Sequence, residues 1–115
     1  MNQELQGIEI DREVALARVG GDTPLLKEIA QLFLEDYPKV LAELRIALGK
    51  GDAKAVERTA HGLKGSVANF GARTAVDAAS RIEGMGHDRQ LTDAPAVLHA
   101  LEAALAALKP ELEAL

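Results

Sequence analysis

Residues 60–71 read AHGLKGSVANFG, and this stretch decides how the rest of the chain is interpreted. Its apolar residues recur at the spacing of one face of a helix, yet Gly62 and Gly65 interrupt it. A glycine inside a helix costs roughly 0.5–1 kcal/mol relative to alanine. Two of them beside His61 indicate that something outside the helix has to come close.

The chain has 115 residues, of which 48% are hydrophobic and 3% aromatic, and it carries a net charge of −5. This length predicts a single domain, and the Ala, Leu, Glu and Lys content favours helices over strands. The sequence has no cysteine, no basic stripe, no signal peptide and no apolar run of the roughly 20 residues that cross a bilayer. We therefore expect a cytoplasmic protein that binds neither nucleic acid nor membrane.

The first half of the chain predicts a leader, a short helix and a long helix. Residues 1–8 look like a flexible leader, and a short helix begins at Asp11. A second helix begins near Pro24 and is either kinked at Pro38 or divided there into two nearly collinear helices. The spacing i, i+4, i+7, i+8 predicts that its first half buries the face formed by Leu25, Ile29, Leu32 and Phe33.

The second half predicts three more helices with short connections. The first runs from about residue 53 to 69, and the next ends at Gly84. Residues 84–91 read as a glycine-rich loop, and a last helix is kinked or ended by Pro110. Three or four long helices joined in this way predict an all-α antiparallel bundle.

The direction of His61 follows from helical geometry. At 100° per residue, His61 lies about 130° from the centre of the apolar stripe of its helix, so it should face water. Gly65 lies next to it one turn on, with Lys64 and Ala68 at the sides of the same patch. A neutral imidazole nitrogen is a good nucleophile, and Lys64 could neutralise part of the charge of a phosphoryl group. The site resembles a reactive platform whose catalytic machinery belongs to a partner.

At these residues the sequence resembles the histidine-containing phosphotransfer (HPt) domain family, whose pattern is A-H-x-L-K-G-S followed by N, an apolar residue, G and A. The matching positions are Ala60, His61, Leu63, Lys64, Gly65, Ser66, Asn69, Phe70, Gly71 and Ala72. The segments at 32–38 and 44–52 and the Ile-Glu pair at 82–83 are also similar to the family, so the resemblance covers nearly the whole chain.

The resemblance implies four antiparallel helices with one or two accessory helices, spanning residues 1–115 as one domain. His61 would accept a phosphoryl group from an aspartate of a receiver domain and pass it to another receiver. Lys64 would bind the phosphoryl oxygens, and Gly65 would leave room for the receiver, which would bring the Mg²⁺. Gly62 departs from the family, which more often has Thr or Ser there.

The expected partners are response-regulator receiver domains, with a hybrid sensor kinase as a further candidate. The partner surface would include Gly62, Ala68, Asn69 and Ala72, although Asn69 also fits a helix C-terminus. We expect a free-standing monomer that binds no metal or cofactor of its own and has little catalytic activity alone.

Two alternatives stay open at this point. One is the phosphoacceptor domain of a chemotaxis-type kinase, which has a similar A-H-x-x-K-G stretch. The other is a helical scaffold that binds a receiver without phosphotransfer, for which binding would not depend on His61. The remaining histidines, His87 in the expected loop and His99 on the last helix, are interpreted as incidental.

Overall fold

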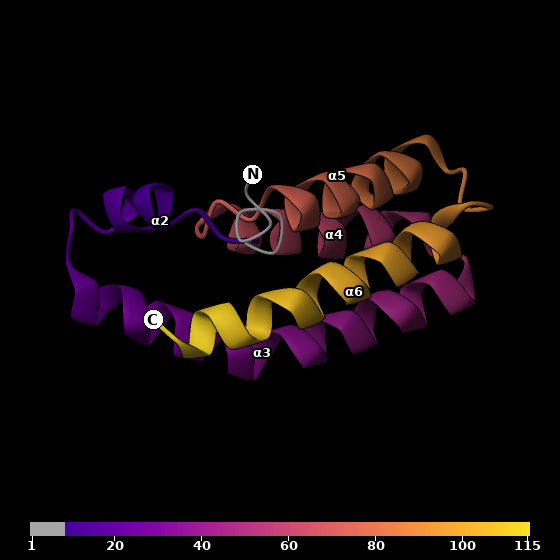
Figure 1. Cartoon of the computed structure of the whole chain (residues 1–115). Coiled ribbons are helices and arrows are strands. Elements are labelled where there is room, and N and C mark those ends of the chain that lie inside the picture. Colours follow the sequence, from indigo (N-terminus) through magenta and orange to yellow (C-terminus); the bar gives the residue numbers. More distant parts are fainter. Residues whose placement is uncertain (1–8) are drawn as a thin grey trace, which may run out of the picture.

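The computed structural model describes residues 9–115, which form an all-α antiparallel bundle of four long helices (Figure 1). The long helices are α3 (Thr23–Lys50), α4 (Ala53–Ala68), α5 (Arg73–Asp88) and α6 (Ala94–Glu113), preceded by one short accessory helix, α2 (Arg12–Arg18). This confirms the predicted fold class. The expected leader, residues 1–8, lies outside the described residues.

Aspartates cap the beginnings of three of the helices. The carboxylates of Asp11, Asp22 and Asp52 each accept a hydrogen bond from the backbone N–H three residues further on, at 3.1–3.2 Å. The chain turns after α3 at Gly51 and after α4 at Gly71, whose φ angles of +67° and +62° lie in the left-handed region. These short turns bring successive helices side by side.

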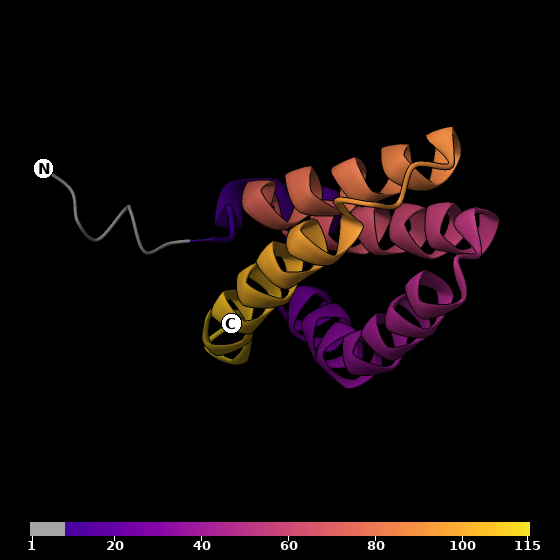
Figure 2. The ribbon, with the colours of Figure 1, turned by 90° about the vertical axis from the view of Figure 1, so that its right-hand side faces the viewer.

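Helix α3 continues through Pro38 as a single helix. Figure 2 shows that it bends about half-way along its length. A proline inside a helix removes one backbone hydrogen bond and pushes against the preceding turn, which accounts for a bend at this place. Of the two alternatives that the sequence leaves open, the kinked single helix is therefore the right one.

The buried face of the first half of α3 differs from the expected one. Leu26, Ala30 and Phe33 are buried, whereas Leu25 and Leu32 are 39% and 59% exposed. Leucines occupy both of two neighbouring helical faces here, so the spacing fits either face. Packing against the other helices selects between them, and the prediction that Leu25 and Leu32 face the core is wrong.

Helix α5 runs on to Asp88, so the predicted glycine-rich loop after Gly84 is also wrong. A Cβ on Gly86 would lie 2.6 Å from the backbone nitrogen of Glu57 and 2.8 Å from the carbonyl oxygen of Ala53. Gly86 therefore lets α5 approach the backbone of α4 closely. The glycine serves the packing of two helices and does not mark a loop.

Helix α6 also continues past Pro110, which neither ends it nor prevents the last turn to Glu113. The last turns of α6 bind the first described residues. The carboxylate of Glu111 accepts hydrogen bonds from the backbone N–H groups of Glu9 and Ile10 at 2.8–3.0 Å. The next residue, Asp11, donates its N–H to the carbonyl of Phe70 at 2.9 Å. Residues 9–11 are thereby attached to the end of α6 and to the turn between α4 and α5.

Candidate functional site

His61 lies on the solvent-exposed edge of α4 that faces α5. The opposite face of α4 enters the core through Val56, Ala60, Leu63 and Val67. The His61 side chain is 68% exposed, which confirms that it faces water. The helix therefore presents the imidazole outward from a rigid, buried stripe.

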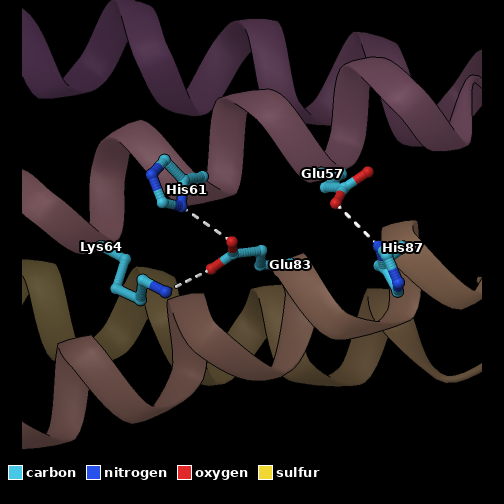
Figure 3. A network of polar contacts seen from close by, with 5 residues as sticks. All are labelled: Glu57, His61, Lys64, Glu83 and His87. Carbon is cyan, nitrogen blue, oxygen red and sulfur yellow. Dashed lines mark hydrogen bonds and ion pairs between the residues drawn. The ribbon is translucent and has the colours of Figure 1, made fainter.

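Three side chains from α4 and α5 form one hydrogen-bonded network around this imidazole (Figure 3). His61 Nδ1 lies 2.8 Å from Glu83 Oε2, and Lys64 Nζ lies 2.6 Å from the other carboxylate oxygen, Glu83 Oε1. Lys64 follows His61 by three residues and so reaches the same side of α4. Glu83 thus ties both predicted site residues to α5.

The hydrogen bond from His61 decides which ring nitrogen can react. An ionised carboxylate can only accept hydrogen bonds, so Nδ1 carries the ring proton and donates a hydrogen bond to Glu83. In the neutral ring the lone pair is then on Nε2. The Lys64 hydrogen bond, assisted by the one from His61, lowers the pKa of Glu83 below its usual value of 4.5 against the opposing effect of burial. Glu83 consequently stays ionised at neutral pH.

Gly62 and Gly65 have no internal packing role. In the described part of the chain, nothing lies within 4 Å of a Cβ built on either residue. Both belong to regular α4, and the Ser66 hydroxyl donates a hydrogen bond to the Gly62 carbonyl at 3.2 Å. The two glycines therefore leave open surface next to His61. This agrees with the expectation that a partner comes close to the helix at this place.

The other residues of the expected partner surface divide into two groups. Ala68 and Asn69 are half-buried at the end of α4. Ala72, by contrast, is only 1% exposed, because the left-handed turn at Gly71 directs it into the core at the start of α5. Ala72 therefore cannot line an exposed surface, and that expectation is corrected.

A shallow hollow of mixed polar and apolar lining, which the sequence did not predict, lies between α3 and α4. It has a volume of about 360 Å³ and is lined by Ile29, Leu32, Phe33, Asp36, Ser66, Asn69 and Phe70. A neighbouring hollow of about 320 Å³ shares Phe33, Asp36 and Ser66 with it and reaches Gly62. The exposed Leu32 belongs to this surface and not to the core.

A second histidine contact lies further along the seam between α4 and α5 (Figure 3). His87 Nδ1, on α5, lies 3.0 Å from Oε2 of Glu57 on α4. The hydrogen bond to Glu57 and its charge raise the pKa of His87 above 6.5. In the sequence, a glutamate precedes a histidine by four residues on both helices, as Glu57 and His61 on α4 and as Glu83 and His87 on α5. The antiparallel register of the two helices then determines which glutamate contacts which histidine.

Within residues 9–115, no three His, Cys, Asp or Glu side chains are grouped so that they could hold a metal ion. In the same part of the chain, no helix is long and apolar enough to cross a membrane.

The comparison with protein families decides the interpretation of this site. The family model of the Hpt domain matches residues 28–111, which include all of α4 and α5 and most of α3 and α6. The chain belongs to the Hpt domain family. It is accordingly a histidine phosphotransfer protein of the two-component phosphorelay type.

A solved structure agrees with this assignment of the Hpt domain. The crystal structure of histidine-containing phosphotransfer protein B (HptB) from Pseudomonas aeruginosa PAO1 matches with a TM-score of 0.84 and 26% sequence identity. The match covers 91% of each chain. A comparison with curated proteins gave no match.

Proposed function

We propose that His61 accepts a phosphoryl group from the phosphorylated aspartate of a receiver domain and passes it to a second receiver. The observation that carries this proposal is the exposed imidazole whose Nδ1 is bound by Glu83, which leaves the Nε2 lone pair free. The receivers determine which of them donates the phosphoryl group and which accepts it. The Hpt domain supplies the nucleophile and its surroundings.

The transfer step needs no proton movement to begin. Nε2 of His61 forms a bond to phosphorus while the bond from phosphorus to the aspartyl oxygen breaks, so the receiver regains its carboxylate. The ring becomes positively charged as the N–P bond forms, and the Nδ1 proton becomes more acidic. Glu83 already accepts that proton's hydrogen bond at 2.8 Å and stabilises the developing charge.

Lys64 has a separate role in this proposal. Its ammonium group lies 2.6 Å from Glu83 before transfer and is carried by a flexible stem on the side of α4 that bears His61. We infer that it turns toward the phosphoryl oxygens after transfer, because a dianion attracts it more strongly than a shared carboxylate. Glu83 keeps its hydrogen bond with His61 when Lys64 leaves.

The receiver would dock over the glycines and the hollow between α3 and α4. Gly62 and Gly65 open the way to His61, and the exposed Leu32 offers apolar surface beside them. Ala68 and Asn69 border this surface, with Asn69 lining the hollow. The receiver also brings Mg²⁺, which neutralises charge on the transferred group. We expect the Hpt domain to act as a monomer, with receivers of separate proteins or of a hybrid sensor kinase as partners.

The proposal is tested by phosphotransfer from receiver domains labelled at their aspartate, with Mg²⁺ present. Label should appear on the wild type and be stable in alkali and labile in acid, as a phosphoramidate bond is. His61→Gln should take no label. His99→Gln makes the same change on α6 and should be labelled like the wild type.

Two outcomes would contradict the proposal. Label on His61→Gln would move the phosphorylated residue elsewhere in the chain. Binding of receivers without label on any of the three proteins, across a broad panel, would instead favour a scaffold that does not carry phosphate.

A further inference from the structure

The hollow that surrounds His61 on the α5 side contains two carboxylates. It has a volume of about 390 Å³ and is lined by Lys54, Glu57, Arg58, His61 and Glu83. A phosphoryl group on His61 is a dianion, so carboxylates in this space repel it unless each is neutralised. Glu83 is compensated by Lys64 at 2.6 Å before transfer and, once Lys64 has turned to the phosphoryl oxygens, by the positively charged ring of His61, whose Nδ1 lies 2.8 Å away. The remaining carboxylate, Glu57, needs a cation of its own.

His87 is in position to supply that cation. Its Nδ1 lies 3.0 Å from Glu57 Oε2, although His87 itself does not line the hollow. Glu57 precedes His61 by four residues on α4, so its carboxylate starts one turn, about 6 Å, from the reacting imidazole. Figure 3 shows Glu57 held at the far side of that turn by His87, away from His61.

The packing of the helices supports this contact. Gly86 lies directly before His87, and its close approach to the backbone of Glu57 fixes the register of α5 against α4. The same register places Glu83, one turn earlier on α5, opposite His61. The two contacts are therefore products of a single arrangement of the two helices.

We propose that His87 is a positioning residue for phosphotransfer: it holds and neutralises Glu57, so that Lys54 and Arg58 give the hollow beside His61 a net positive charge suited to a phosphoryl dianion. This inference rests on the proposed phosphorylation of His61 and adds a residue to that function. His87 itself carries no phosphoryl group in this scheme.

The test measures how a phosphoryl group distributes between a receiver and the Hpt domain at equilibrium, using a receiver that labels the wild type. At pH 6.5 and low salt, His87→Gln should shift the distribution about three- to fivefold toward the receiver, because Glu57 is then uncompensated. His87→Arg keeps the positive charge and should match the wild type. The shift should nearly vanish in 1 M salt, where the Debye length is about 3 Å.

The double variant separates charge from structure. Glu57→Gln combined with His87→Gln removes both charges and should restore the wild-type distribution, whereas a structural role of His87 would leave the defect in place. His99→Gln is the matched control on α6 and should change nothing. Wild-type distribution in His87→Gln at low salt, or no rescue by Glu57→Gln, would overturn the inference.

Failure of this inference can be told apart from failure of the proposed function. If His61→Gln also takes label, the phosphorylated residue has been assigned wrongly and both ideas fall. If His61→Gln takes none and all His87 variants equilibrate like the wild type, only the role of His87 is wrong.

Discussion

The seam between α4 and α5 contains two histidine–carboxylate contacts of opposite sense. In one, α4 supplies His61 and α5 supplies Glu83; in the other, α4 supplies Glu57 and α5 supplies His87. Both imidazoles use Nδ1, at 2.8 and 3.0 Å, and their side chains are 68% and 72% exposed. By contact geometry alone, the two histidines are nearly equivalent.

Their surroundings make them different. Glu83 also binds Lys64, which lowers the pKa of Glu83, whereas Glu57 acts mainly by raising the pKa of His87. His61 is followed one turn later by a glycine that leaves its surface open, while the turn after His87 lies at the end of α5. A histidine held by a carboxylate is therefore no site by itself. The added cation and the open approach are the reasons for proposing His61, and not His87, as the phosphoryl acceptor.

The largest effect is expected from the glycine that holds both contacts in register. Gly86→Ala should lower the free energy of unfolding by about 2 kcal/mol, because its Cβ would meet backbone atoms of α4 at 2.6–2.8 Å. Urea denaturation measures this change. Gly84→Ala is the matched control on the same helix, with open space around the added Cβ, and should stabilise by about 0.5–1 kcal/mol. Equal stability of the two variants would show that the helices separate easily and that neither contact depends on Gly86.

This glycine also marks what the sequence could predict and what it could not. The limits of α4, its buried stripe and the outward direction of His61 follow from periodicity within one helix, and the structure confirms them. The role of Gly86, by contrast, depends on the contact of α5 with a second helix, α4. In the sequence it looks the same as a loop glycine, so the sequence alone predicts that the helix ends at Gly84.

The pairing of the site residues with their partners cannot be inferred from the sequence for the same reason. Lys64 is three residues from His61 and could be assigned to the site by spacing alone. Glu83 and His87 reach α4 only because α5 returns antiparallel to it in one register. The Ile-Glu pair at 82–83 resembles the family, but nothing in the sequence indicates that Glu83 contacts His61. Local periodicity gives helices and directions, whereas pairing between helices requires packing.

The second-largest effect separates the two carboxylates. Glu83→Gln should slow phosphotransfer to His61 roughly tenfold, because it removes the charge that stabilises the phosphorylated ring. Glu57→Gln makes the same change in the other contact and should transfer at the wild-type rate or slightly faster. Rapid-quench measurement of label gives both rates. If the two variants slow transfer equally, the contacts are equivalent in function and the distinction between them fails.

A smaller effect concerns the open surface beside His61. Gly65→Ala should raise the free energy of unfolding by about 0.5–1 kcal/mol, since alanine favours the helix and its Cβ meets nothing. Gly65→Leu should fold as well but transfer phosphate more slowly, because the side chain would stand in the path of the receiver. Gly49→Leu, on the helical end of α3, also points into open space and should leave transfer unchanged. Normal transfer by Gly65→Leu would mean that the receiver does not approach over this glycine.

The smallest effects are on stability as pH changes, and they have opposite signs in the two contacts. The pKa of His87 is raised in the folded protein, so its contact with Glu57 stabilises fully below pH 6.5 and is lost as pH rises through the folded pKa. The difference in Tm between the wild type and His87→Gln should be present at pH 6 and absent at pH 9. Glu57→Gln removes the same contact and should give the same curve.

For Glu83 the folded pKa is lowered, so the sign reverses. Its contacts with Lys64 and His61 stabilise above pH 4.5, the usual value, and are lost as pH falls through the lower folded pKa. The difference in Tm between the wild type and Glu83→Gln should therefore persist at pH 6 and close only in acid. Both contacts are exposed, so the differences in Tm are small. The pH at which each difference disappears does not depend on how large the difference is. If both gaps closed on the alkaline side, the ion pair with Lys64 would not account for the stabilisation by Glu83, and the two contacts would be alike.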